Sequence, residues 1–126
     1  MIKLVAIGNR FMQDDGIAIH VTEYLEETFK ELNLEIIIGE TDCQGAFYLL
    51  DKDDFVIILD AQYIGSEPGH IHLFSLEEAV SKPSSYCMQH DMNIIELMKL
   101  YNQPFRGYLI GIEVASVALG LSLIHI

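Results

Sequence analysis

The chain has 126 residues, of which 51% are apolar and 21% charged, a composition typical of one folded domain rather than of a disordered segment. Nineteen acids against seven bases give a formal net charge of -12, with histidines counted as neutral. A surface of this sign repels nucleic acids and anionic membranes, and no apolar run reaches the ~20 residues of a membrane span. With two cysteines that lack CxxC spacing, we expect a cytoplasmic protein with no nucleic-acid or membrane partner.

The first half of the chain has the pattern of an α/β unit. A nearly continuous apolar run predicts a strand buried on both faces, and apolar positions three or four residues apart predict an amphipathic helix. In chain order, we expect a buried strand over residues 2–7, a polar loop over 8–16, an amphipathic helix from Ile17 to Leu32, a strand over 34–38, a loop over 41–45 and a helical turn over 46–50.

The second half alternates in the same way. In chain order, we expect a fully buried strand over 55–59 that ends on Asp60, a loop over 62–69, a strand over 70–74, a loop over 82–86, a helix over 91–101 and a last strand over 107–112. This order predicts a single α/β domain over residues 1–126. Its three layers are a twisted, mostly parallel sheet of about five strands with helices on both faces, and ligands bind at the carboxyl ends of the strands.

Acidic and imidazole side chains fall where α/β folds place function. Asp14 and Asp15 precede the first helix. Asp60 ends the most buried strand, and His90 stands directly before the last helix. Each has a structural explanation of its own, as a helix cap, a first-turn acid, a turn residue or a surface residue. Together, two carboxylates and one imidazole form a three-ligand site for a divalent first-row metal.

Other polar residues carry weaker signals. His70 and His72 share one face of a strand, but no acid is close in sequence, so we expect surface or edge residues. Cys43 lies beside Asp42, whose negative charge raises the thiol pKa and makes this cysteine a poor nucleophile. A phosphoacceptor receiver module is excluded, because the acidic pair lies well beyond the first strand and Glu113, not a lysine, follows the last one.

Four segments follow one another over nearly the whole chain. They are Gly8-Asn9-Arg10-Phe11-Met12-Gln13-Asp14-Asp15-Gly16, then Asp60-Ala61 with Gly65, Pro68 and Gly69, then His90 before an apolar helix, and finally Gly111-Ile112-Glu113 followed by Gly120. In the same order, they resemble the GNxLxxDDGxG, DAxxxGxxPG, histidine and GIxPxxxxxG signatures of the hydrogenase maturation endopeptidases.

The resemblance implies an endopeptidase that removes a C-terminal extension from a [NiFe] hydrogenase large-subunit precursor after nickel insertion. It implies that Asp15, Asp60 and His90 bind the metal, and these side chains are also the catalytic candidates. The nickel is carried by the precursor, so we expect the three side chains to recognise it there. Zinc or cadmium is expected to substitute in vitro, because such ligands select weakly among metals.

Two routes to hydrolysis stay open. Either the metal polarises the carbonyl or a water, or a carboxylate such as Asp15 or Asp14 acts as general base. The absence of an evident Ser or Cys triad disfavours covalent catalysis. The alternative to a protease is a non-proteolytic, metal-dependent binding or chaperone module of the same fold. A spore-germination protease of this fold is disfavoured, because the hydrogenase-type signatures match in order.

The chain departs from the family pattern at several places. Ala18 replaces the second glycine of the first signature, and Val114 stands where a proline is usual. Asp42, Cys43 and Gln44 occupy the loop that the resemblance implicates in handling the substrate, in place of an Asp-Gly-Gly-Thr-like run. Residues 114–126 are almost entirely apolar, and the resemblance implies a domain that lacks its C-terminal helix.

Overall fold

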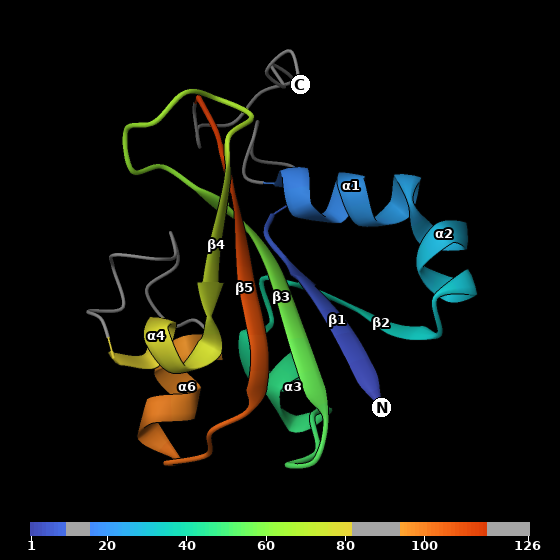
Figure 1. Ribbon diagram of the computed structural model, residues 1–126, viewed down its shortest axis with the longest axis vertical. Helices are drawn as coiled ribbons and strands as arrows, with labels where there is room; N and C mark the ends of the chain where they lie inside the picture. Colours follow the sequence, from blue (N-terminus) through green and yellow to red (C-terminus); the bar gives the residue numbers. More distant parts are fainter. Residues whose placement is uncertain (10–15, 82–93, 116–126) are drawn as a thin grey trace.

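The computed structural model describes residues 1–9, 16–81 and 94–115. Within these residues, five strands form one sheet, shown in Figure 1. The strands are β1 (Ile2–Ile7), β2 (Leu34–Glu40), β3 (Phe55–Gln62), β4 (Ile71–Ser75) and β5 (Arg106–Glu113). The helices in the described residues are α1 (Ile17–Tyr24), α2 (Glu26–Glu31), α3 (Cys43–Tyr48), α4 (Leu76–Ser81) and α6 (Ile94–Leu100).

The strand order is β2-β1-β3-β5-β4. The pairs β1–β2, β1–β3 and β3–β5 are parallel, and only β4 runs antiparallel, on the outer side of β5. The expected mostly parallel sheet of about five strands is therefore confirmed. In Figure 1, β1, β3 and β5 run upward, toward the start of α1 and the segment that joins β3 to β4. The parallel pairing places the end of β2 beside the end of β1, so the four parallel strands end at one edge of the sheet. We call this the carboxyl edge.

Apolar side chains cover both faces of the sheet, as expected for a three-layer fold. One core joins the sheet to α3, α4 and α6, and its sheet residues include Val5, Val56, Ile58 and Leu109. The second, smaller core joins α1 to the other face through Ile17, Ala18, Leu59, Ala61 and Ile112. Because side chains alternate along a strand, Val56 and Ile58 assign one face of β3 to α3 and α6, and Leu59 and Ala61 assign the other to α1.

Several boundaries differ from the expected ones. The helix expected from Ile17 to Leu32 is divided at Leu25, because α1 packs on a sheet face and α2 packs along the edge strand β2. The strand expected to end on Asp60 continues to Gln62, because its pairing with β5 continues as far as Glu113.

Two helices begin where the sequence pattern gave no such indication. α3 begins at Cys43, inside the expected 41–45 loop, because the Asp42 carboxylate accepts a hydrogen bond from the Gly45 amide at 2.9 Å. α4 was not expected, and its first turn is capped by the Ser75 hydroxyl, which accepts from the Glu78 amide at 3.0 Å. The expected 82–86 loop and most of the 114–126 tail lie outside the described residues.

A buried ion pair closes the opposite end of the sheet. The Lys3 ammonium lies 2.7 Å from the Asp54 carboxylate and donates to the Leu49 carbonyl, also at 2.7 Å. The side chains of Lys3 and Asp54 are 7% and 5% exposed. The hydrogen bond between them raises the pKa of Lys3 and, together with the Asp51 amide, lowers the pKa of Asp54.

Candidate functional site at the carboxyl edge

Three fully buried polar side chains lie at the carboxyl edge, on the face that α3 and α6 cover. Asp60 and Gln62 of β3 and Glu113 of β5 are all 0% exposed. Along β3, the positions of Val56 and Ile58 are continued by Asp60 and Gln62, so one face of the strand changes from apolar to polar as it reaches its end. Buried polar groups are costly unless they are partnered, which marks this end as a candidate site.

Asp60 lies where β3, α3 and α6 meet. Its Oδ1 accepts a hydrogen bond from the Ala61 amide at 2.8 Å. The Cys43 thiol is close enough that the Asp60 charge affects it, and the Ile94 amide at the start of α6 hydrogen-bonds to the same thiol. Burial, with Asp60 as the second cause, raises the pKa of Cys43 to about 11. The expectation of a poor nucleophile is therefore confirmed, although burial and Asp60 raise this pKa more than Asp42, the charge on which the expectation was based.

The three residues expected in a substrate-handling loop open α3 instead of forming a free loop. The Asp42 carboxylate is engaged as the helix cap, the Cys43 side chain is buried, and the Gln44 amide donates to the Tyr48 hydroxyl at 2.8 Å. A cleft of about 490 Å³ nevertheless lies beside them. Its lining residues come from the ends of β1 and β2 and from the start of α3: Asn9, Ile38, Gly39, Glu40, Thr41 and Asp42.

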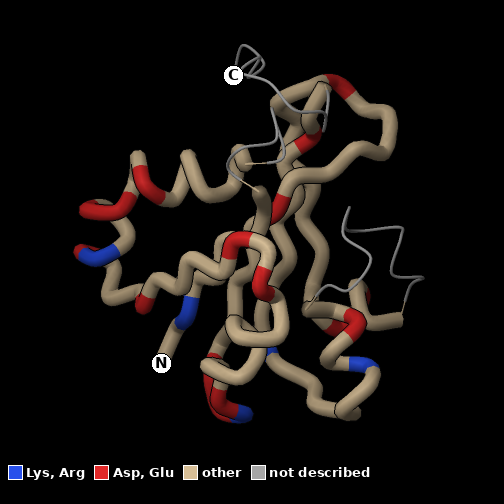
Figure 2. Tube along the Cα trace, turned by 180° about the vertical axis from the view of Figure 1, so that it is seen from behind, with Lys and Arg blue, Asp and Glu red and all other residues tan. Residues whose placement is uncertain are grey.

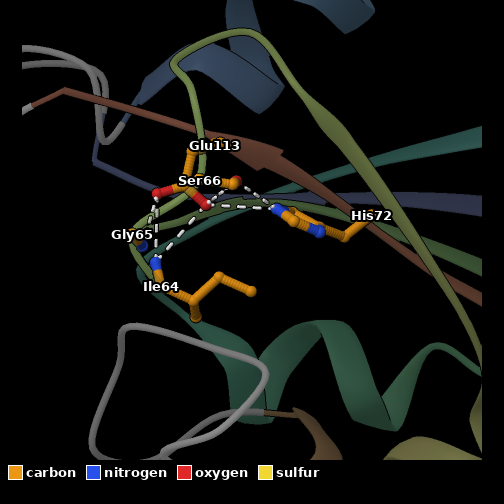
Figure 3. A network of polar contacts seen from close by, with 5 residues as sticks. All are labelled: Ile64, Gly65, Ser66, His72 and Glu113. Carbon is orange, nitrogen blue, oxygen red and sulfur yellow. Dashed lines mark hydrogen bonds and ion pairs between the residues drawn. The ribbon is translucent and has the colours of Figure 1, made fainter.

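Glu113 ties the segment after β3 to the sheet, as Figure 3 shows. Its Oε2 accepts from the amides of Ile64 and Gly65 at 3.0 and 3.1 Å. Its Oε1 accepts from the Ser66 hydroxyl at 2.9 Å and lies 3.1 Å from Nε2 of His72. The expectation that His72 is an edge residue is confirmed, because β4 is the outermost strand next to β5. The acid beside it could not be found from neighbours in sequence, because the antiparallel pairing of β4 with β5 brings the distant Glu113 to it.

Ser66, His72 and Glu113 do not form a catalytic triad. In a triad the acid holds Nδ1 of the histidine and the serine faces Nε2. Here the Ser66 hydroxyl, at 2.8 Å, and the Glu113 carboxylate both face Nε2. Because the hydroxyl donates its proton to Glu113, it can only accept from His72, so Nε2 carries the proton and cannot act as a base toward Ser66.

The charge at this edge is acidic. The described Lys and Arg residues lie in α2, at the end of α6, or toward the opposite end of the sheet. In Figure 2, the described charged positions at the upper edge are all acidic. The segment between β3 and β4 also presents apolar surface here, because the side chains of Tyr63 and Ile64 are 57% and 44% exposed. The described part of the edge therefore favours a partner that is not anionic and that has apolar side chains.

A family model described as hydrogenase maturation protease matches residues 19–120. The chain belongs to this family. Three solved structures resemble it. [NiFe] hydrogenase maturation protease HybD from Thermococcus kodakarensis is 22% identical with a TM-score of 0.72, over 98% of this chain and 86% of that chain. HycI from Thermococcus kodakarensis KOD1 is 21% identical with a TM-score of 0.75, over 94% of this chain and 76% of that chain. An endopeptidase from Escherichia coli is 20% identical with a TM-score of 0.76, over 97% of this chain and 79% of that chain. No curated protein matches the chain.

Membership confirms the resemblance to the family, and the matched residues include the last three of the four signature segments. The solved structures share the fold of this chain. Of the three expected metal-contacting residues, the structure describes Asp60 alone. Asp15, with its neighbour Asp14, and His90 lie outside the described residues, so their convergence on Asp60 stays a prediction. Within residues 1–9, 16–81 and 94–115, no group of three His, Cys, Asp or Glu side chains could hold a metal ion.

The maturation protease brings the described neighbours of these positions to the carboxyl edge. Gly16, which follows Asp15 in sequence, caps α1, whose first residues pack on Leu59 and Ala61 of β3. Ile94, four positions after His90, hydrogen-bonds to the thiol that lies beside Asp60. No described helix is long and apolar enough to cross a membrane. Gln62 and Glu113 were not among the site residues expected from the sequence. Glu113, the polar residue that ends the apolar run of β5, could have been found from that pattern, whereas Gln62 could not, because the apolar run of β3 already ends at Asp60.

Proposed function

We propose that this maturation protease cleaves the C-terminal extension from a [NiFe] hydrogenase large-subunit precursor after nickel has been inserted. Asp15, Asp60 and His90 contact the nickel that the precursor carries, so that only the loaded precursor is cleaved. Asp60 carries this proposal, because it is a fully buried carboxylate at the carboxyl edge, between α3 and the start of α6. Zinc or cadmium takes the place of nickel in vitro, because carboxylate and imidazole ligands accept several divalent metals.

Water is the attacking group in this proposal. Hydrolysis adds the water oxygen to the carbonyl carbon of the scissile bond and delivers a proton to the departing amine. Cys43 does not compete as the nucleophile, because its thiol is buried and its pKa is about 11, so it stays protonated near neutral pH. Ser66 is disfavoured as well, because Nε2 of His72 faces its hydroxyl as a donor and so provides no imidazole base for it. A carboxylate of the Asp14-Asp15 pair takes the water proton, or the precursor's nickel polarises the carbonyl.

Incubation with nickel-loaded and nickel-free precursor, followed by mass spectrometry of the products, tests the proposal. We expect cleavage of the loaded precursor alone. Asp60→Asn keeps the size of the side chain but removes its charge, and we expect it to lower kcat/KM at least roughly 100-fold, as loss of a group acting on the reacting centre does. Glu67→Gln, an exposed acid on the same edge, is the matched control and should cleave normally.

The outcomes separate the hypotheses. Binding of the loaded precursor without cleavage, under conditions where a known family member cleaves it, would identify the non-proteolytic binding module. Equal cleavage of loaded and nickel-free precursor would refute the hypothesis that the protein recognises the nickel. Normal cleavage by Asp60→Asn would remove Asp60 from the site.

A further inference from the structure

The segment between β3 and β4 is held by one buried carboxylate. Glu113 accepts hydrogen bonds from two consecutive backbone amides, from one hydroxyl and from the His72 ring, so both of its oxygens are used (Figure 3). Its own backbone adds two more bonds, because its carbonyl accepts from the Gly69 amide and its amide donates to the His70 carbonyl. Residue 113 thus fastens this segment near its start and near its end.

These hydrogen bonds leave the apolar side chains of the segment, Tyr63 and Ile64, exposed. The amides of Ile64 and Gly65 are directed inward to Glu113, while Tyr63 and Ile64 are about half exposed. Such a segment presents a fixed apolar surface three and four positions after Asp60. Without the Glu113 side chain, the amides of Ile64 and Gly65 would lose their acceptor, in a segment whose glycines 65 and 69 already adopt positive φ.

We propose that Glu113 is a positioning residue that fixes residues 63–66 as one wall of the precursor-binding site. This inference rests on the proposed function and names the residues that bind the precursor beside Asp60. Asp60 itself is held independently, because its neighbours Leu59 and Ala61 pair with β5 and pack against α1. Loosening the wall therefore weakens binding of the precursor and leaves the chemical step nearly unchanged.

Kinetics on the nickel-loaded precursor separate binding from chemistry. Glu113→Ala removes every side-chain bond to the wall, and we expect KM to rise about tenfold or more, with kcat within roughly twofold of the original. Glu113→Gln keeps one oxygen for the two amides and places its NH2 group against Ser66. Its KM should therefore lie between the KM of the original protein and that of Glu113→Ala. Glu67→Gln removes a charge from the same segment at an exposed position, and its KM should stay unchanged.

Two spectroscopic readouts do not require cleavage. In 15N NMR spectra, Nε2 of His72 should carry the proton in the original protein, and Glu113→Gln should shift the proton to Nδ1, because the new NH2 group needs an acceptor. Hydrogen exchange at the Ile64 and Gly65 amides should be slow in the original protein and at least tenfold faster in Glu113→Ala. His72→Gln, which keeps Glu113 and its two amide bonds, should leave this exchange slow.

An unchanged KM in Glu113→Ala, or a loss confined to kcat, would overturn the proposal, and so would fast amide exchange in the original protein. If the original protein does not cleave the loaded precursor, the proposed function fails. The role of residues 63–66 in binding the precursor can still be tested. The dissociation constant of the loaded precursor then replaces KM. A tenfold weaker complex with Glu113→Ala supports the wall, and equal binding refutes it.

Discussion

Gly111 lets the buried Gln62 side chain cross from β3 to β5. A Cβ built on Gly111 would lie 2.1 Å from Cδ, 2.2 Å from Oε1 and 2.5 Å from Cγ of Gln62, where an ordinary contact is 3.4–4 Å. Gly111→Ala therefore overlaps one fully buried side chain by more than 1 Å, and Gln62 must leave its place. Overpacking of this kind costs about 1–3 kcal/mol, so Tm should fall by roughly 4–12 °C for a domain of this size.

A double-mutant cycle with urea denaturation tests the cause. Because Gly111 does not have a positive φ, the cost comes from Gln62 alone, and Gln62→Ala should remove most of it. We expect the two changes to be non-additive by about 1 kcal/mol or more, in the direction of rescue. Gly107→Ala is the contrasting variant, because its Cβ would meet the backbone of Val56, which no side-chain truncation relieves. Additivity of Gly111→Ala and Gln62→Ala would refute the reasoning.

Two further predictions follow from the shifted pKa values. Because Lys3 lowers the pKa of Asp54 below its ordinary 3.8, the pair stabilises the folded chain above that pH and is lost as the pH falls through the lowered value. Asp54→Asn should therefore lower Tm at pH 6 and flatten the loss of Tm below pH 4. Cys43, with a pKa of about 11, should react with iodoacetamide at pH 8 roughly 100-fold slower in the folded than in the urea-unfolded chain, as peptide mapping measures. Equal rates would contradict its burial.

Much of the sheet could be predicted because its central strands are buried on both faces. Such strands are continuous apolar runs, and residues 2–7 and 55–59 therefore stood out without knowledge of their neighbours. Asp60 could be placed at the carboxyl edge for the same reason, since it is the first charged residue after the run. The true end of β3 could not be placed this way, because Gln62 is kept in the sheet by its pairing with Glu113 and by the space at Gly111.

The His72–Glu113 contact could not be predicted from the sequence pattern, for a physical reason. Residues in neighbouring strands meet through register, and register depends on which strands are adjacent and in which direction they run. The pattern gave β4 as a strand but not its antiparallel direction beside β5, so the nearest acid in sequence was a poor guide to the nearest acid in space. Short elements such as α4 were missed because six residues are too few to show a helical spacing of apolar positions. The first turn of α4 is capped by the Ser75 hydroxyl.

The change from apolar to polar side chains along one face of β3 is itself an argument for function. Val56 and Ile58 pack into the larger core, and apolar residues at the next two positions of that face would extend this core to the carboxyl edge. The chain instead buries Asp60 and Gln62 there, with Glu113 beside them on β5. Each must be desolvated on folding, and a buried carboxylate is destabilising unless it gains strong partners. Apolar residues at these positions would avoid that desolvation, so the polar end of the strand supports the proposed site more than it supports the core.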